Sequence, residues 1–217
     1  MPKKNALIVI LLVLFVDQVT KIYIKTHFEL GQEFVVFDWF KILFVENDGM
    51  AWGAKLSDFS AHISDKTAKL VLTLFRLVAV VGIGCWLYTT IKKKSAHHLI
   101  YALALIFSGA LGNIIDSVFY GVVFDDSLGQ KASLFSENPY GSLFYGKVVD
   151  MLHFPVLKGY LPNWMPFVGG EYFTFFNPVF NFADVAISTG VGLLLVYNHR
   201  NSSSKQNPNQ TDKSDLA

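Results

Sequence analysis

Polar and ionisable side chains stand inside or at the ends of long apolar stretches of this sequence. They are Asp17 and Lys21, Arg76, Asn113 and Asp116, and Asn181 and Asp184. Ionisable groups are costly inside a membrane, so they face the protein interior or a wet cavity and are candidates for function. The paired residues are three or four positions apart, which places each pair on one helix face. The first pair is expected either to stabilise its helix end as an ion pair or to serve a site.

Two carboxylates held close together at low dielectric constant cannot both ionise easily. One keeps a proton and can donate a hydrogen bond to a carbonyl, while the other can act as a general base on water. This is the chemistry of an aspartyl protease. Carboxylates within spans are also typical of proton-coupled transport, so a carboxylate-based membrane transport or scaffold protein is the alternative. A chain with four spans and no inverted repeat is a poor transporter unless it oligomerises.

The composition indicates an integral membrane protein. Of the 217 residues 52% are hydrophobic and 20 are Phe, and the mean hydropathy is +0.39. Four stretches approach the roughly 20 apolar residues that a bilayer requires. They are residues 6–24, 68–91, 98–120 and 178–197. We therefore expect an all-α membrane protein with four transmembrane helices in a single domain, residues 1–198, followed by a disordered cytoplasmic tail, residues 199–217.

The basic residues predict an orientation with both termini in the cytoplasm. Lys3 and Lys4 precede the first span, a basic triplet at 92–94 separates the second from the third, and basic residues follow the fourth. The longer loops, 25–67 and 121–177, then face the other side. In the first, "EFVVFDWFKILFVEN" favours short strands, and we expect a small extracytoplasmic β-cradle. The second is expected to be irregular.

Several classes of function find no support in the residue types. The formal net charge of +1 gives no reason to expect nucleic acid as a partner. A single cysteine, Cys85, excludes an internal disulfide, and the histidines lack paired metal spacing. No Gly-x-Ser-x-Gly elbow is present. We expect neither a metal nor an organic cofactor.

Five short motifs occur in order along the chain. They are "DQVTK" (17–21), "ENDGMAWG" (46–53), "GALGNIID" (109–116), "GKVVDM" (146–151) and "FNFADVAI" (180–187). This set resembles the motifs of bacterial lipoprotein signal peptidase, signal peptidase II. The resemblance implies a four-helix aspartyl endopeptidase of the bacterial inner membrane. Such an enzyme removes signal peptides from diacylglycerated prolipoproteins, cleaving before the lipid-modified cysteine.

The resemblance also implies roles for individual residues. It makes Asp150 and Asp184 the catalytic dyad, near the outer face of the membrane. It assigns active-site support or substrate binding to Asp17, Lys21, Asn47, Gly53, Gly109, Asn113, Asn181 and Ala183. The implied partners are diacylglyceryl-modified prolipoproteins and membrane lipid, and we expect a monomer.

The sequence departs from the family pattern at three places. Ser117 stands where the family usually has an Arg, and Arg76 is a candidate substitute. The segment 122–145 intervenes before the "VVD" motif and either covers the site or lies beside it. In the first loop, Asp48, Met50 and Trp52 stand where the family tends to smaller or different side chains, which affects the expected substrate contacts.

The intervening segment leaves more than one carboxylate as the partner of Asp184. "FYGVVFD" ends in Asp125 and "FYGKVVD" ends in Asp150. We favour Asp150, because "GKVVDM" matches the family pattern without a gap. Asp116 is the third candidate.

Overall fold

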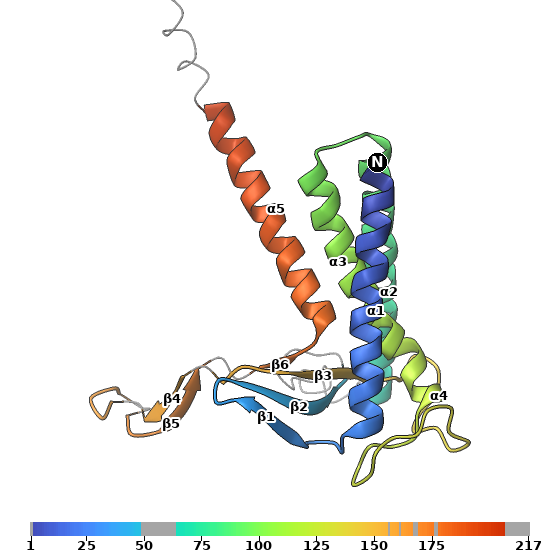
Figure 1. The fold of residues 1–217 in the computed structure, drawn as a ribbon, viewed down its shortest axis with the longest axis vertical. Helices are drawn as coiled ribbons and strands as arrows, with labels where there is room; N and C mark the ends of the chain where they lie inside the picture. The colour runs from blue at the N-terminus through green and yellow to red at the C-terminus, as the bar shows by residue number, and fades with distance from the viewer. Residues whose placement is uncertain are drawn as a thin grey trace, which may run out of the picture.

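Apolar helices dominate the architecture. The computed structural model describes residues 2–48, 64–155, 157–160, 162–166, 169–175 and 178–206. Within these residues, three helical segments are long and apolar enough to cross a membrane. They are α1 (Pro2–His27), α2 (Asp65–Lys92), and a continuous segment made of α3 (His97–Ile115), the π-helical turn η3 (Asp116–Tyr120) and α4 (Gly121–Val123). Helix α5 (Phe182–Gln206) is apolar over a shorter stretch, Phe182–Tyr197. Figure 1 shows α1, α2 and α3 standing together, with α5 beside α3.

Helix α5 differs at both ends from the expected span at 178–197 and the expected tail from 199. Residues Val179–Phe180 form a strand, and the helix begins at Phe182 because Asn181 caps it. At the other end the helix continues to Gln206. Neither glycine nor proline interrupts this polar stretch before Pro208, so nothing in the backbone chemistry stops the helix at 199. Residues 207–217 lie outside the described part of the chain.

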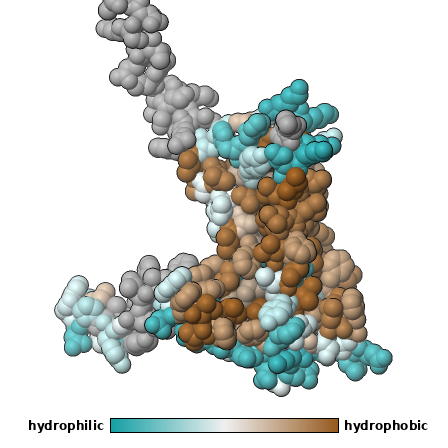
Figure 2. Space-filling model, viewed as in Figure 1, coloured by the Kyte–Doolittle hydropathy of each residue, from teal (hydrophilic) through white to brown (hydrophobic). Residues whose placement is uncertain are grey.

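The helices expose apolar side chains on their outer surfaces and bury charged side chains between them. Side chains such as Leu11, Phe15 and Val78 are exposed on helix surfaces. Asp17 and Lys21, one turn apart on α1, are fully buried. Figure 2 shows the hydrophobic surface over the middle of the helices, with hydrophilic residues gathered at the two ends. Apolar outer surfaces with the charged side chains buried are what a surrounding hydrocarbon solvent favours.

A four-stranded antiparallel sheet lies across one end of the helices (Figure 1). Its order is β1 (Glu33–Phe37), β2 (Phe40–Asn47), β3 (Val148–His153), β6 (Val179–Phe180), and a second sheet pairs β4 (Leu157–Tyr160) with β5 (Tyr172–Phe175). The strands of the first loop were predicted. The second long loop is not irregular throughout, because it supplies β3 to β6, so the fold combines helices with small sheets and is not all-α. The six residues of β3, "VVDMLH", are all buried, and β2 supplies the pairing that so short a segment lacks alone.

The register between β2 and β3 fixes which side chains face the helices. Val45 pairs with Asp150, and Glu46 pairs with Val149. Directly paired residues point to the same face of a sheet and successive residues point to opposite faces. Asp150 and Glu46 are therefore neighbours on adjacent strands, but their side chains point to opposite faces of the sheet.

The inserted segment 122–145 packs against the end of α1 and the sheet. Phe124, Ser127 and Ala132 are buried. The Ala132 N–H donates to the Lys25 carbonyl at 3.1 Å, and the Leu30 N–H donates to the Ser127 carbonyl at 3.2 Å. The segment is thus part of the packed structure at the sheet end of α1.

Candidate active site

The first turn of α5 orients Asp184 through a capping box. The Asn181 Oδ1 atom accepts from the Asp184 N–H at 3.0 Å, and the Asp184 Oδ2 atom accepts from the Asn181 N–H at 3.2 Å. A residue before a helix and the third residue of its first turn thereby satisfy each other's free N–H groups. The carboxylate of Asp184 is held at the helix terminus with its other oxygen available to neighbours.

Asp150 reaches the same place from strand β3. Its Oδ1 atom accepts from Asn181 Nδ2 at 2.7 Å, and its Oδ2 atom accepts from Asn47 Nδ2 at 3.2 Å. The Oδ1 atom of Asp184 accepts from Asn113 Nδ2 at 2.9 Å. We call Asn47, Asn113 and Asn181 the amide network, because these three side chains hydrogen-bond the two carboxylates without adding charge.

Burial and a neighbouring acid tune Asp150. Its side chain is 4% exposed. Burial raises the pKa of Asp150, the charge of Asp184 raises it further, and the pKa comes to about 7 although Asn47, Lys21 and Asn181 act against the rise. A carboxylic acid with such a pKa exchanges its proton near neutral pH, which suits acid and base catalysis.

Lys21 fixes the orientation of the amide network. Its Nζ atom lies 2.9 Å from Asp17 Oδ2, 2.8 Å from Asp116 Oδ2 and 2.8 Å from Asn113 Oδ1. An ammonium group can only donate, so the Asn113 oxygen must face Lys21. The NH₂ group of Asn113 must then face Asp184. The lysine acts on the carboxylate through the amide between them.

Asp17 connects α1 to the start of α5. Its Oδ1 atom accepts from the Ala183 N–H at 2.9 Å. Gln18 Nε2 donates to Asp17 Oδ2 at 3.1 Å and to Asp116 Oδ1 at 2.9 Å. Asp17 therefore satisfies one of the N–H groups that a helix terminus leaves without an internal partner.

Two glycines allow the helices to approach closely enough for these contacts. A Cβ atom at Gly109 would lie 2.3 Å from the Ala183 carbonyl oxygen, and one at Gly112 would lie 2.6 Å from Asp17 Oδ2. Small residues are used in this way where helix backbones approach in membranes. Gly109 and Ala183 therefore serve the site by packing α3 against α5.

Most of the residues expected around the dyad meet in one place. Connected hydrogen bonds join Asp17, Lys21, Asn47, Asn113, Asp150, Asn181, Ala183 and Asp184. Gly53 lies outside the described residues, as do Met50 and Trp52. The rival carboxylate Asp125 instead accepts from the Ser133 N–H at 2.6 Å, within the inserted segment. Ser117 donates its hydroxyl to the Asn113 carbonyl at 3.0 Å, along its own helix.

The sequence assignment missed two participants, Gln18 and Gly112, and gave Asp116 a different role. Asp116 is fully buried beside Lys21, Gln18 bridges two carboxylates, and Gly112 lies against Asp17. Gln18 and Gly112 lie inside the motifs "DQVTK" and "GALGNIID". The motifs therefore contained these residues, but nothing in the sequence distinguished them from their neighbours as site residues. Asp116 was a candidate for the dyad, and its contacts with Lys21 and Gln18 give it a supporting place.

The opposite face of the β2–β3 pair carries a second group of charges, which we call the lysine cluster. It consists of Lys25, Glu46, Lys147 and Ser127. Glu46 forms ion pairs with Lys25 and, at 3.0 Å, with Lys147. Burial would raise the pKa of Glu46, but the two lysines outweigh it and hold the pKa below its usual range. This cluster ties α1, β2 and the inserted segment together.

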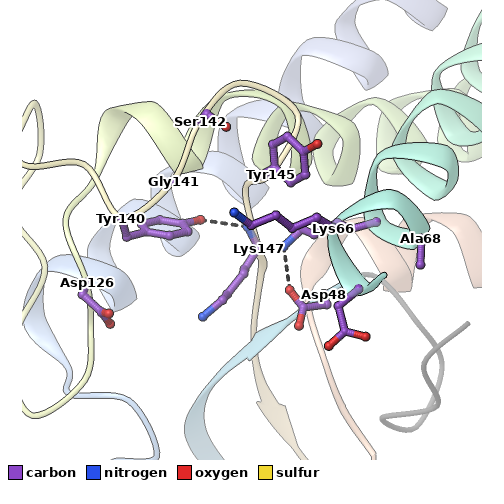
Figure 3. A pocket seen from close by; sticks show the side chains of 11 residues that line it. Asp48, Lys66, Ala68, Asp126, Tyr140, Gly141, Ser142, Tyr145 and Lys147 are labelled. Atoms are coloured by element: carbon purple, nitrogen blue, oxygen red, sulfur yellow. Dashed lines mark hydrogen bonds and ion pairs between the residues drawn. The ribbon is translucent and has the colours of Figure 1, made fainter. Parts of the chain in front are cut away.

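Two cavities lie near these groups. One, of about 640 Å³, opens between the start of α2 and the segment from Tyr140 to Lys147, and Figure 3 shows its lysines and aspartates. The other, of about 740 Å³, is almost wholly apolar and has Asp184 in its wall. Its other lining residues are Phe40, Leu152, Phe154, Pro178, Phe180, Phe182, Val185, Ser188 and Thr189. Among the described residues, no three His, Cys, Asp or Glu side chains are grouped as metal ligands.

Known proteins share both the sequence and the fold. The family model described as Signal peptidase (SPase) II matches residues 9–133 and 135–200. A lipoprotein signal peptidase of Porphyromonas gingivalis is 52% identical over 194 residues, which are 88% of this chain and 80% of the relative. One from Amoebophilus asiaticus is 36% identical over 86% of this chain and 74% of the relative.

Solved structures support the same conclusion at the level of the fold. A bacterial membrane enzyme determined at 2.3 Å resolution by the in meso method aligns with a TM-score of 0.61 and 23% identity, over 95% of this chain and 94% of that one. The extent of the family match and the identity to the curated relatives decide the family. The chain belongs to the signal peptidase II family, the lipoprotein signal peptidases.

Proposed function

We propose that this protein is an aspartyl endopeptidase that removes signal peptides from diacylglycerated prolipoproteins, cutting before the lipid-modified cysteine. Membership of the signal peptidase II family supports the substrate class. The mechanism rests on one observation: both acids accept hydrogen bonds from Asn181. Its side-chain NH₂ donates to Asp150 and its backbone N–H donates to Asp184. The other proposed site residues support this pair.

The proposed mechanism divides the roles of the two acids. Ionised Asp184 takes a proton from water, whose oxygen attacks the scissile carbonyl carbon, while protonated Asp150 gives its proton to the carbonyl oxygen. The C–N bond of the tetrahedral intermediate then breaks as Asp184 passes its proton to the leaving nitrogen. Asp150 recovers a proton from the intermediate, and the dyad returns to its starting state. The raised pKa of Asp150 supports its role as the acid at neutral pH.

We further propose that α5 is the fourth membrane span of a monomeric enzyme in the bacterial inner membrane, with residues 1–198 as one domain. Lys3, Lys4 and the basic triplet at 92–94 lie at the helix ends away from the sheet, which supports cytoplasmic termini and a site near the outer face. The four-stranded sheet is then an extracytoplasmic cradle. The mechanism requires no metal, organic cofactor or nucleic acid.

The apolar cavity beside Asp184 suits a substrate that remains in the membrane. Its aromatic wall offers a place for an apolar part of the precursor next to the reacting carboxylate. Exposing an acyl chain to water would cost about 0.8 kcal/mol per CH₂ group. A dyad at the membrane surface avoids that cost and still has access to water.

The test is cleavage of a diacylglycerated prolipoprotein by purified enzyme at matched concentrations. Asp150→Asn and Asp184→Asn should each lower the rate by on the order of 10⁴-fold, because the two acids act as a unit. Asp125→Asn is the matched control and should cleave like the wild type, since Asp125 contacts the inserted segment. Cleavage by either dyad variant would contradict the mechanism. An inactive but folded wild type would favour a transport or scaffold function.

A further inference from the structure

The proposed dyad lacks a cation of its own among its hydrogen-bond partners described above. Lys21 reaches the dyad through Asn113, and its three N–H donors are used by Asp17, Asp116 and Asn113. Its charge also acts on Asp150 at longer range, but two other carboxylates are in direct contact with it. The amide network binds the dyad without neutralising it. A second positive charge is therefore needed if the dyad is to carry a negative charge in a site of low dielectric constant.

Helix α2 places a guanidinium at the right depth. Arg76 lies one turn from Thr73 and from Val80, on the stripe of α2 that faces α3. Thr73 donates to the Phe144 carbonyl at 3.3 Å, and Val80 packs in one cluster with Ile114 and Val118. Val80 thus packs beside Ile114, which follows Asn113, the residue of α3 that contacts Asp184. Arg76 is one turn from Val80 and therefore lies level with that end of α3.

The charge of Arg76 acts on both carboxylates. Its side chain is partly buried, and its electrostatic interaction is strongest with Asp184 and next with Asp150. Arg keeps its charge in proteins, and its long stem allows the head to reach a polar site from a helix in the membrane. Among the described residues, the other charged groups around the dyad are Lys21 and Asp17 from α1 and Asp116 from η3.

We propose that Arg76 is the counter-ion of the dyad, a positioning and charge-stabilising residue that keeps the pair singly negative at neutral pH. The proposal rests on the aspartyl mechanism and adds to it the source of the opposing charge. A single negative charge is the form in which one acid can act as the base and the other as the donor. Within the described part of the chain, three ionised carboxylates of the region face two cations when Arg76 is present and only Lys21 when it is not.

The pH profile of cleavage tests this role, because a residue that only packs would not move it. Replacing a cation near a carboxylate raises the pH at which the carboxylate ionises. In Arg76→Met the acid limb of kcat/KM should move up by about one pH unit, at the lower end of the range for a neighbouring opposite charge. Arg76→Lys should restore the limb to the wild-type position. Removing a charge from the middle of a span favours membrane insertion, so the Met variant is expected to accumulate.

Lys69→Gln is the matched control. Lys69 lies seven residues before Arg76, on the same face of α2, and pairs with Asp48 at 2.6 Å. Its acid limb should stay at the wild-type position. An unshifted limb in both Arg76→Met and Arg76→Gln would overturn the proposal, as would an equal shift in Lys69→Gln. If Asp150→Asn and Asp184→Asn retained activity, the catalytic dyad would be refuted. If both were inactive while Arg76→Met kept the wild-type pH profile, only the role of Arg76 as counter-ion would be refuted.

Discussion

Two buried acids on adjacent strands have opposite surroundings. Glu46 on β2 points to the face where Lys25 and Lys147 pair with it, and its pKa is held below the usual range although burial would raise it. Asp150 on β3 points to the face where amides and another acid meet it, and its pKa rises to about 7. The two lysines keep Glu46 ionised, and the resulting ion pairs stabilise the fold. Amides hold a carboxylate in place and leave its proton exchangeable, which is what a catalytic acid needs.

The largest contrast is expected between two lysines of α1. Lys21→Met leaves Asp17 and Asp116 buried beside each other without their cation, so we expect a loss of about 3–5 kcal/mol in the free energy of unfolding. Lys25→Met leaves Glu46 paired with Lys147, and its loss should be clearly smaller. Thermal unfolding of both variants in detergent micelles measures this. Equal losses would contradict this contrast, because they would mean that Asp17 and Asp116 depend on Lys21 no more than Glu46 depends on Lys25.

The amide network is tested by Asn181→Ala. The change removes the cap of α5 and the donor to Asp150, and the cleavage rate should fall by about 10²-fold, as when one preorganised donor is removed from an active site. Ser64→Ala removes the cap of α2, whose Ser64 Oγ accepts from the Thr67 N–H at 3.2 Å, and does not touch the dyad. Rates of both variants at matched concentrations separate catalysis from capping. A comparable fall in Ser64→Ala would contradict the catalytic role.

The two acids should affect stability with opposite dependence on pH. The pKa of Glu46 is lowered, so its ion pairs stabilise the fold above the usual pKa of glutamate, and that contribution is lost as pH falls through the lowered value. The pKa of Asp150 is raised, so ionising it costs stability increasingly between its usual pKa and about 7. At pH 8, Glu46→Gln should melt below the wild type and Asp150→Asn above it. Melting curves at pH 5 and pH 8 should show the Asp150→Asn difference shrinking at pH 5, while the Glu46→Gln difference stays nearly constant, because pH 5 is still above the usual pKa of glutamate.

The smallest effect is expected at the rim of the lysine cluster. The side chain of Lys147 is 31% exposed, so its ion pair with Glu46 is partly screened by water. Lys147→Gln should cost at most about 1 kcal/mol and leave the cleavage rate unchanged. Unfolding and cleavage measured on the same preparation test this. A large loss of activity would place the lysine cluster in the catalytic machinery.

The sequence predicted those parts of the fold and site that depend on local pattern. Apolar length predicted the three long apolar helices, and the resemblance that the motifs carry predicted that Asp150 and Asp184 lie together. Strand β3 was missed because its six residues owe their conformation to pairing with β2. The contact from Asp17 to the Ala183 N–H joins residues 166 positions apart, and no local pattern indicates it.

The opposite faces of Glu46 and Asp150 could not be predicted either. Both acids stand in short motifs with apolar neighbours, and their difference comes from a register between two strands. A shift of that register by one residue would exchange the faces. The roles of such acids therefore become visible only when the pairing is known.

The most direct test of the central claim is infrared difference spectroscopy of the protonated carboxyl group of Asp150 as a function of pH. Wild-type protein in lipid should show a protonated-carboxyl band that is absent from Asp150→Asn and disappears as pH rises through about 7. The same band should persist in Glu46→Gln, because Glu46 is ionised throughout this range. If Asp150 gave no protonated band at pH 5.5, the dyad would carry two negative charges, and the proposed division between acid and base would be contradicted.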